Sequence, residues 1–140
     1  MNYNQLFSSF KGQEILVALI GAGQFGETFI RQCRRISGMQ ISFVCDLQPE
    51  RARAALLAAG YDKSALVSVS SNEEAATAFN NHQIIITSDY RLIKGLPLDC
   101  VVEATGSPEA AAQVGQITVM SGFHLAMITK EADIVVGPYL

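Results

Sequence analysis

Three glycines near the start of the chain place the strongest constraint on its fold. Gly21, Gly23 and Gly26 follow the continuous apolar run 15–20 and precede a segment whose apolar residues recur at helical spacing. After a strand, the first glycine permits a tight turn, the second lets the backbone approach a pyrophosphate, and the third lets the helix pack closely on the strand. The free N–H groups at the start of that helix attract phosphate. The pattern therefore predicts a strand–turn–helix unit that binds a nucleotide, in preference to turn glycines without a ligand role.

Strands and helices are expected to alternate along the rest of the chain. Hydrophobic patterning predicts strands at 15–20, 41–45, 84–87, 100–104 and 124–128. It predicts helices at 1–10, 27–36, 50–59, 71–80 and 109–120, with Pro49 and Pro108 at first helical positions and a helical turn at 89–94. Such alternation implies right-handed crossovers and a doubly wound, mostly parallel sheet with helices on both faces. We therefore expect an α/β Rossmann fold that is truncated after about the fifth strand.

The length of the chain suits one domain. It has 140 residues, of which 49% are apolar, and this is enough to bury a real core. A complete two-half Rossmann sheet has six strands, whereas this chain ends shortly after the fifth expected strand. We therefore expect a single dinucleotide-binding domain over 1–140 that forms the N-terminal fragment of a longer protein.

Charge, cysteine and histidine usage argue against several other functions. The net charge is −3 and the basic residues are scattered, so no nucleic-acid partner is expected. The longest apolar run, 15–22, is too short to cross a bilayer, and no membrane partner is expected. Cys33, Cys45 and Cys100 form no CxxC pair and suit reduced thiols in the cytoplasm. His82 and His124 have no neighbours at ligand spacing, so no metal site is expected.

An acidic residue follows the second expected strand. Asp46 lies 25 positions beyond Gly21, where a carboxylate can accept hydrogen bonds from an adenosine ribose. It would repel a 2′-phosphate, which favours NAD over NADP. Arg51 and Arg53 are close enough in sequence to keep NADP open. The alternative is that Asp46 only caps the helix that starts at Pro49.

Polar residues after the fourth and fifth expected strands fall at the same edge of a parallel sheet. The segment 105–107 follows the fourth strand beside the reversal of strand order, and we expect it to border the nicotinamide half. The alternative is a plain connection in which Ser107 caps the next helix. Glu103 needs a polar partner if it is buried, and we interpret it as structural. Lys130 follows the fifth strand and is a candidate cation or proton carrier, the alternative being a solvated lysine.

The candidate cofactor site combines these features with the glycine turn. Gln24 is expected to approach the phosphates, and Phe25 is expected to pack beneath the helix rather than touch the ligand. The candidate cofactor-binding residues are Gly21, Ala22, Gly23, Gln24, Phe25, Gly26, Asp46, Arg51, Ala104, Thr105 and Gly106. The candidate catalytic residue is Lys130.

The same residues resemble a known family, the NAD(P)-binding domain of homoserine dehydrogenase. The resemblance is closer still to homoserine-dehydrogenase-like oxidoreductases that carry a later SAF domain, a subgroup that includes enzymes similar to deoxyxylulose phosphate reductoisomerase. It spans nearly the whole chain and rests on residues 19–26, Asp46 with 49–53, 101–106 and 131–140.

The resemblance implies an NAD(P)-dependent oxidoreductase that transfers hydride to or from a small hydroxy or carbonyl substrate. It also implies a homo-oligomeric full-length enzyme whose substrate-binding segments lie largely beyond Leu140, so the fragment alone would bind a dinucleotide without catalysis. Homoserine dehydrogenases have an Asn–Lys pair after the fifth strand, where this chain has Thr129–Lys130. That departure argues against true homoserine dehydrogenase activity.

Two other functions are compatible with a glycine-rich turn. A non-catalytic, nucleotide-sensing regulatory module, such as those attached to potassium channels, uses a similar Rossmann unit, but the segments 105–106 and 137–138 speak against it. A methyltransferase that binds S-adenosylmethionine fits poorly, because the glycine spacing suits a pyrophosphate.

Overall fold

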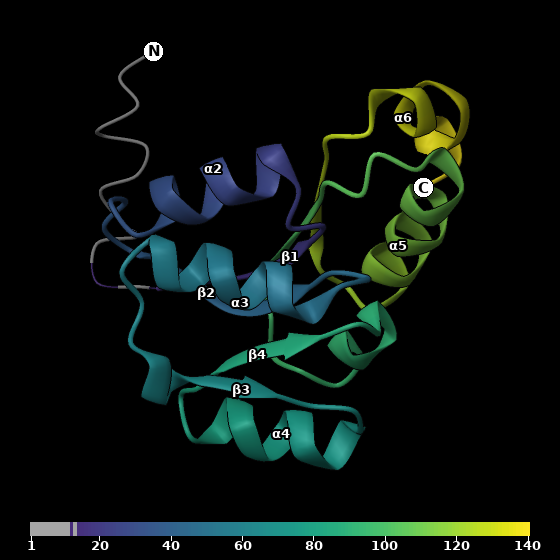
Figure 1. Cartoon of the computed structure of the whole chain (residues 1–140). Helices are drawn as coiled ribbons and strands as arrows, with labels where there is room; N and C mark the ends of the chain where they lie inside the picture. The colour runs from purple at the N-terminus through teal and green to yellow at the C-terminus, as the bar shows by residue number, and fades with distance from the viewer. Residues whose placement is uncertain (1–11, 13) are drawn as a thin grey trace.

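A six-stranded parallel sheet forms the centre of the molecule (Figure 1). The computed structural model describes residue 12 and residues 14–140. The strands are β1 (Ile15–Ile20), β2 (Met39–Cys45), β3 (Leu66–Ser68), β4 (Ile84–Thr87), β5 (Cys100–Glu103) and β6 (His124–Met127), in the order β3-β4-β2-β1-β5-β6. The α-helices are α2 (Gln24–Cys33), α3 (Pro49–Ala58), α4 (Asn72–Asn80), α5 (Pro108–Met120) and α6 (Lys130–Val136). Short 3-10 helices occur at η2 (Lys63–Ala65), η3 (Tyr90–Ile93) and η4 (Gly137–Tyr139).

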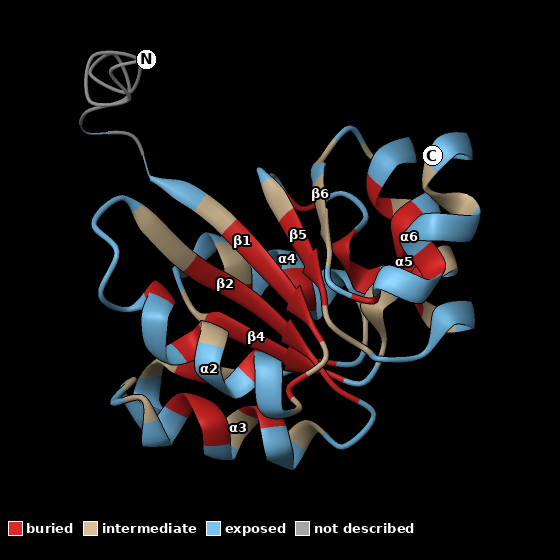
Figure 2. Ribbon diagram, turned by 90° about the horizontal axis from the view of Figure 1, so that it is seen from above, coloured by how far each residue is buried: buried red, intermediate tan, exposed pale blue. Residues whose placement is uncertain are grey.

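Helices cover both faces of the sheet, and each face has its own apolar core (Figure 2). Successive residues of β1 point to opposite faces, so Leu19 packs with Ile30 of α2 and Leu56 of α3, whereas Ile20 packs on the opposite face with Val114 of α5. Burial on both faces is the reason that β1 is a continuous apolar run.

The strand order reverses beside β1. The chain passes from β1 to β2 on one side, and later returns from β4 to β5 on the other side. The turns that leave the carboxyl ends of β1 and β5 therefore lie next to each other and lead to helices on different faces. In sheets of this kind, ligands bind in the crevice at this point.

The predicted doubly wound α/β Rossmann fold is confirmed, but the strand count was wrong. The additional strand is β3, which pairs with β4 at the outer edge of the sheet. Its three residues carry too short a pattern to distinguish a strand from a loop. The helix α6 was also not predicted. The expected helix at 1–10 lies outside the described residues.

The predicted boundaries differ most at the helix after the glycines. It was expected at 27–36 but occupies Gln24–Cys33, because it begins directly after Gly23. Pro49 and Pro108 are the first residues of α3 and α5, as expected. Within the described part of the chain, every helix is too short or too polar to span a bilayer.

Candidate functional site

Two of the three glycines are required by the fold itself. Gly21 has a φ of +104°, and a side chain there would collide with the carbonyl oxygen of Ala104 in the turn after β5. A side chain at Gly26 would collide with the carbonyl oxygen of Gly21. Both obstacles are backbone atoms, which cannot move aside cheaply. The close contact of Gly21 with Ala104 also brings together the turns that follow β1 and β5.

Gly23 is different, because nothing in the protein requires a glycine there. Its φ of −72° and ψ of −163° are open to any residue, and a Cβ would have only the Arg51 guanidinium nearby, at 3.8 Å. The helix α2 starts immediately after Gly23 without a side-chain cap, whereas Ser71 and Ser107 cap α4 and α5. The start of α2 therefore offers uncapped N–H groups and open space beside the Arg51 guanidinium. This combination suits an anion such as a pyrophosphate.

Asp46 links the turns that follow β1 and β2. Its Oδ2 accepts a hydrogen bond from the Ala22 N–H at 2.8 Å, and its Oδ1 accepts one from the Gln48 N–H at 2.9 Å. The residue that caps α3 is Gln48, so the alternative that Asp46 only caps this helix is wrong. Each carboxylate oxygen can accept a further hydrogen bond, so Asp46 is still able to bind a ribose hydroxyl. That contact stays a prediction.

The two arginines that kept NADP open lie in different environments. Arg51 is exposed and reaches toward Gly23. Arg53 donates a hydrogen bond to the Ser68 hydroxyl at 2.7 Å and lies 3.8 Å from the Glu50 carboxylate. Of the two, Arg51 is the one placed to meet a phosphate at the glycine turn.

The first turn of α2 exposes Gln24 and Phe25. The Phe25 side chain is 45% exposed and stacks on Phe29, with ring centroids 6.3 Å apart. The expectation that Phe25 packs beneath the helix is wrong, because Gly26 and Ile30 occupy the face of α2 that meets the sheet. Gln24 is exposed at the first helical position beside Gly23, and its approach to the phosphates stays a prediction.

A fully buried carboxylate organises the other half of the site. The Oε1 of Glu103 accepts hydrogen bonds from the Thr105 N–H and hydroxyl, both at 2.7 Å, and from the Thr129 hydroxyl at 2.9 Å. Its Oε2 accepts a bond from the Thr129 N–H at 3.2 Å. The Thr129 hydroxyl also accepts the Gly106 N–H at 3.1 Å. The loops after β5 and β6 therefore converge on Glu103, which agrees with its interpretation as structural.

Ser107 and Lys130 follow these two loops. The Ser107 side chain accepts a hydrogen bond from the Ala110 N–H at 3.4 Å, so it caps α5 as the alternative interpretation proposed. Lys130 is exposed at the first position of α6, next to Thr129. The Glu103 bonds therefore bring Lys130 to the same edge as the loop 105–107.

A further turn at this edge was not predicted as part of the site. It follows β4, and the Thr87 carbonyl accepts a hydrogen bond from the Asp46 N–H at 3.1 Å. Asp89 lies in this turn, where hydrogen bonds from Arg91 lower the pKa of its carboxyl group. The sequence signal was available, because Ser88 and Asp89 directly follow a predicted strand, at the edge where its neighbours carry the candidate residues.

Neither a reactive thiol nor a metal-binding group lies at this edge in the described residues. Burial raises the pKa of the Cys45 thiol, at the end of β2, to about 12, with further contributions from Asp46 and Asp89. Among residues 12 and 14–140, no group of three or more His, Cys, Asp and Glu side chains is placed to hold a metal ion. The arrangement is suited to holding an anionic ligand by backbone N–H groups and Arg51.

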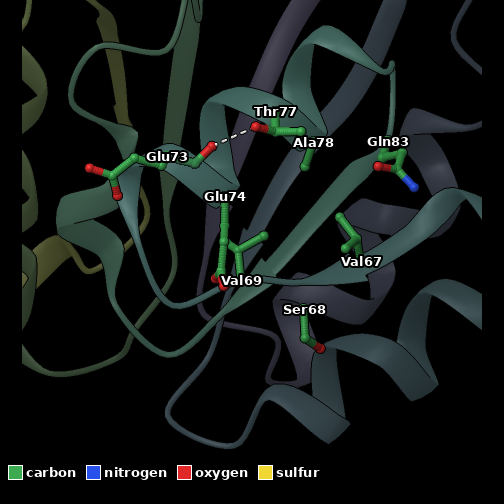
Figure 3. Close-up of a pocket in the computed structure, with 8 residues that line it drawn as sticks. All are labelled: Val67, Ser68, Val69, Glu73, Glu74, Thr77, Ala78 and Gln83. Carbon is green, nitrogen blue, oxygen red and sulfur yellow. Dashed lines mark hydrogen bonds between the residues drawn. The ribbon is translucent and has the colours of Figure 1, made fainter.

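A pocket of about 410 Å³ lies elsewhere, between β3 and α4 (Figure 3). None of the candidate site residues lines it. Glu74, which does line it, is engaged with the N–H and hydroxyl of Ser70. The pocket is therefore separate from the glycine turn.

Comparison with known proteins identifies the family. Residues 16–97, more than half of the chain, match the family described as NADP oxidoreductase, coenzyme F420-dependent. The chain belongs to this family. The matched residues run from β1 through the turn after β4 and include the glycine turn, Asp46 and Arg51. No curated protein matches the chain.

One solved structure shares the fold at low sequence identity, and a second is more distantly similar. A dehydrogenase from Chromobacterium violaceum is 20% identical, with a TM-score of 0.56, over 82% of this chain and 28% of that one. An oxidoreductase from Agrobacterium radiobacter, solved with NAD+, L-tartaric acid and magnesium, is 16% identical, with a TM-score of 0.43, over 83% of this chain and 35% of that one. The chain thus spans about a third of the length of these proteins. Together with the family match, the fold makes this chain an NAD(P)-binding Rossmann domain of the oxidoreductase class.

Proposed function

We propose that the chain is the cofactor domain of an NAD(P)-dependent oxidoreductase similar to homoserine-dehydrogenase-like enzymes. The observation that carries the proposal is the open space at Gly23, over the uncapped start of α2 and beside Arg51. Gly21 and Gly26 are explained by packing, whereas Gly23 is explained by the approach of a ligand. The donors at this point are N–H groups and a guanidinium, which match a pyrophosphate in charge and in hydrogen bonding.

The dinucleotide is proposed to extend from the turn after β2 to the turn after β5. Gly23, Gln24 and the first N–H groups of α2 would hold the pyrophosphate, Asp46 would face the adenosine ribose, and Thr105–Gly106 would border the nicotinamide. When bound, the cofactor supplies the hydride chemistry. The residues of this chain bind and orient it.

The choice between NAD and NADP is proposed to depend on Asp46 and Arg51. The Asp46 carboxylate favours a ribose hydroxyl and opposes a 2′-phosphate, which gives NAD a slight advantage. Arg51 is exposed beside the glycine turn and favours phosphate. Because Arg53 is engaged with Ser68 and Glu50, it is not expected to take part.

The reaction is proposed to require residues outside this chain. The substrate is expected to be a small hydroxy or carbonyl compound, and Lys130 is the candidate cation or proton carrier at its end of the site. We propose that residues 1–140 form the N-terminal domain of a longer, cytoplasmic and homo-oligomeric enzyme. The domain alone should bind the cofactor without turnover.

Calorimetric titration of the chain with NAD+ and with NADP+, each up to millimolar concentration, tests the proposal. Saturable heat with at least one of the two is expected. The absence of binding to both would overturn the proposed function.

A further inference from the structure

The Glu103 network consists of Glu103, Thr105, Gly106 and Thr129, joined by the hydrogen bonds described above. In the described part of the chain, the ion pairs join Arg53 to Glu50 and Arg91 to Asp89, and neither involves Glu103. A buried carboxylate without a cation is costly, and here four N–H and O–H donors offset that cost.

Packing alone does not explain a carboxylate at this position. Its neighbours in β5, Val101 and Val102, are apolar and equally buried. An apolar residue at a buried site is often as stabilising as a charged one. What the carboxylate adds is a fixed distance between the loops after β5 and β6, because it bonds Thr129, which lies 26 residues away from Glu103 in sequence.

Thr129 supports this interpretation independently. It occupies the N-cap position of α6, yet its side chain makes no cap hydrogen bond. A serine or threonine cap is worth about 1 kcal/mol to a helix. Instead, the Thr129 hydroxyl donates to Glu103 and accepts from the Gly106 N–H. Gly106 itself has a φ of +70°, so its backbone is held in a conformation that few other residues adopt.

We propose that Glu103 and Thr129 are positioning residues that fix the loop after β5 against the loop after β6, and so shape the nicotinamide end of the cofactor site. This inference rests on the proposed function, because it places the nicotinamide beside Thr105–Gly106. The ADP-ribose portion is proposed to bind at the glycine turn and Asp46. The Thr105 backbone packs against Gly21, but the hydrogen bonds of the Glu103 network run only among Glu103, Thr105, Gly106 and Thr129. The network therefore contributes to binding of the nicotinamide and not of the ADP-ribose portion.

The test compares two ligands that differ only by the nicotinamide. NAD+ is paired with ADP-ribose, or NADP+ with 2′-phospho-ADP-ribose, according to which dinucleotide the unaltered chain binds more tightly. Thr129→Val removes the hydroxyl but keeps the shape, so Glu103 loses one donor and the Gly106 N–H loses its acceptor. We expect Thr129→Val to raise the Kd of the dinucleotide about tenfold, corresponding to about 1.4 kcal/mol. The Kd of the ligand without nicotinamide should stay within about twofold.

Two further variants separate positioning from a general loss of stability. Thr129→Ser keeps the hydroxyl and should restore dinucleotide binding. Ser71→Ala removes the cap of α4, away from these loops, and should lower stability by about 1 kcal/mol without changing either Kd. Equal weakening of both ligands by Thr129→Val, or no weakening of the dinucleotide, would overturn the inference and leave the proposed function intact. If the unaltered chain bound neither ligand, both would be overturned.

Amide hydrogen exchange in the unaltered chain provides a measurement that needs no variant. The dinucleotide should slow exchange at Gly106 and Thr129 by at least about fivefold more than the ligand without nicotinamide does. Equal protection by the two ligands would overturn the inference.

Discussion

Replacement of Gly23 by alanine should separate ligand binding from folding. The backbone at Gly23 is in an ordinary extended conformation, and the nearest atom to a new Cβ is the far end of the Arg51 side chain, at 3.8 Å. Alanine restricts the unfolded chain, which stabilises the fold by about 0.4–1 kcal/mol. It is also a poorer N-cap than glycine, and this offsets part of that gain. The free energy of unfolding should therefore change by less than about 1 kcal/mol.

Binding should change much more. The added methyl group occupies the space through which a pyrophosphate would approach the first N–H groups of α2. Loss of one hydrogen bond to a charged group corresponds to about 1.5–3 kcal/mol. The Kd for the dinucleotide should therefore rise roughly 10- to 150-fold.

Gly26→Ala is the matched comparison, since the same methyl group there meets the Gly21 carbonyl oxygen. It should lower the free energy of unfolding by about 1–3 kcal/mol. Urea denaturation measures the stability of both variants, and calorimetry with NAD+ and NADP+ measures binding. An unchanged Kd in Gly23→Ala would refute the assignment of this turn to the pyrophosphate, as would a loss of stability as large as that of Gly26→Ala.

Three other perturbations give distinct outcomes. Arg51→Gln should raise the Kd for NADP+ about tenfold and should also weaken NAD+, because the pyrophosphate proposed beside Arg51 is common to both cofactors. Arg53→Gln should leave the Kd for NADP+ within about twofold, since Arg53 is engaged with Ser68. Equal effects of the two substitutions on the Kd for NADP+ would contradict this. Asp46→Ala should lower the free energy of unfolding by about 1–3 kcal/mol, because two backbone N–H groups lose their acceptor, and should weaken NAD+ more than NADP+. Equal loss for the two cofactors would show that Asp46 has no contact with the ribose. Burial raises the pKa of Cys33 from 9.0 to about 11 and that of Cys45 to about 12, so the native chain at pH 8 should react with iodoacetamide far more slowly than the unfolded chain. The stability that these two buried, protonated thiols contribute should be fully present below pH 9, and it should be lost as the pH rises toward 11 because the unfolded chain then ionises first. Denaturation at a series of pH values would detect this loss.

The strands that the sequence predicted best are those buried on both faces. β1 and β4 were predicted with their observed bounds, because their residues are apolar at nearly every position and polar or turn-forming residues follow. β3 could not be predicted in the same way. Its Ser68 is exposed, and its place in the sheet comes from pairing with β4, which is distant in sequence.

The candidate site was predictable where its chemistry is local. The glycines constrain the backbone within a few residues, so their spacing was enough to locate the turn. The partners of Asp46 and Glu103 depend on tertiary structure, since the Ala22 N–H and Thr129 lie 24 and 26 residues away from them. Pattern alone could place each carboxylate at the correct edge but could not show that both organise loops. The exposure of Phe25 likewise depends on which face of α2 meets the sheet.

The contact between Gly21 and the Ala104 carbonyl has a consequence for how a ligand would be received. It joins the turns that follow β1 and β5, while Asp46 ties the first turn to the end of β2 and Glu103 ties the second to the loop after β6. Turns braced in this way are preorganised, so little conformational entropy is lost when a ligand binds to them. The backbone of this edge should therefore be nearly the same with and without ligand. Variants of the site should differ in how fast the ligand leaves more than in how fast it arrives.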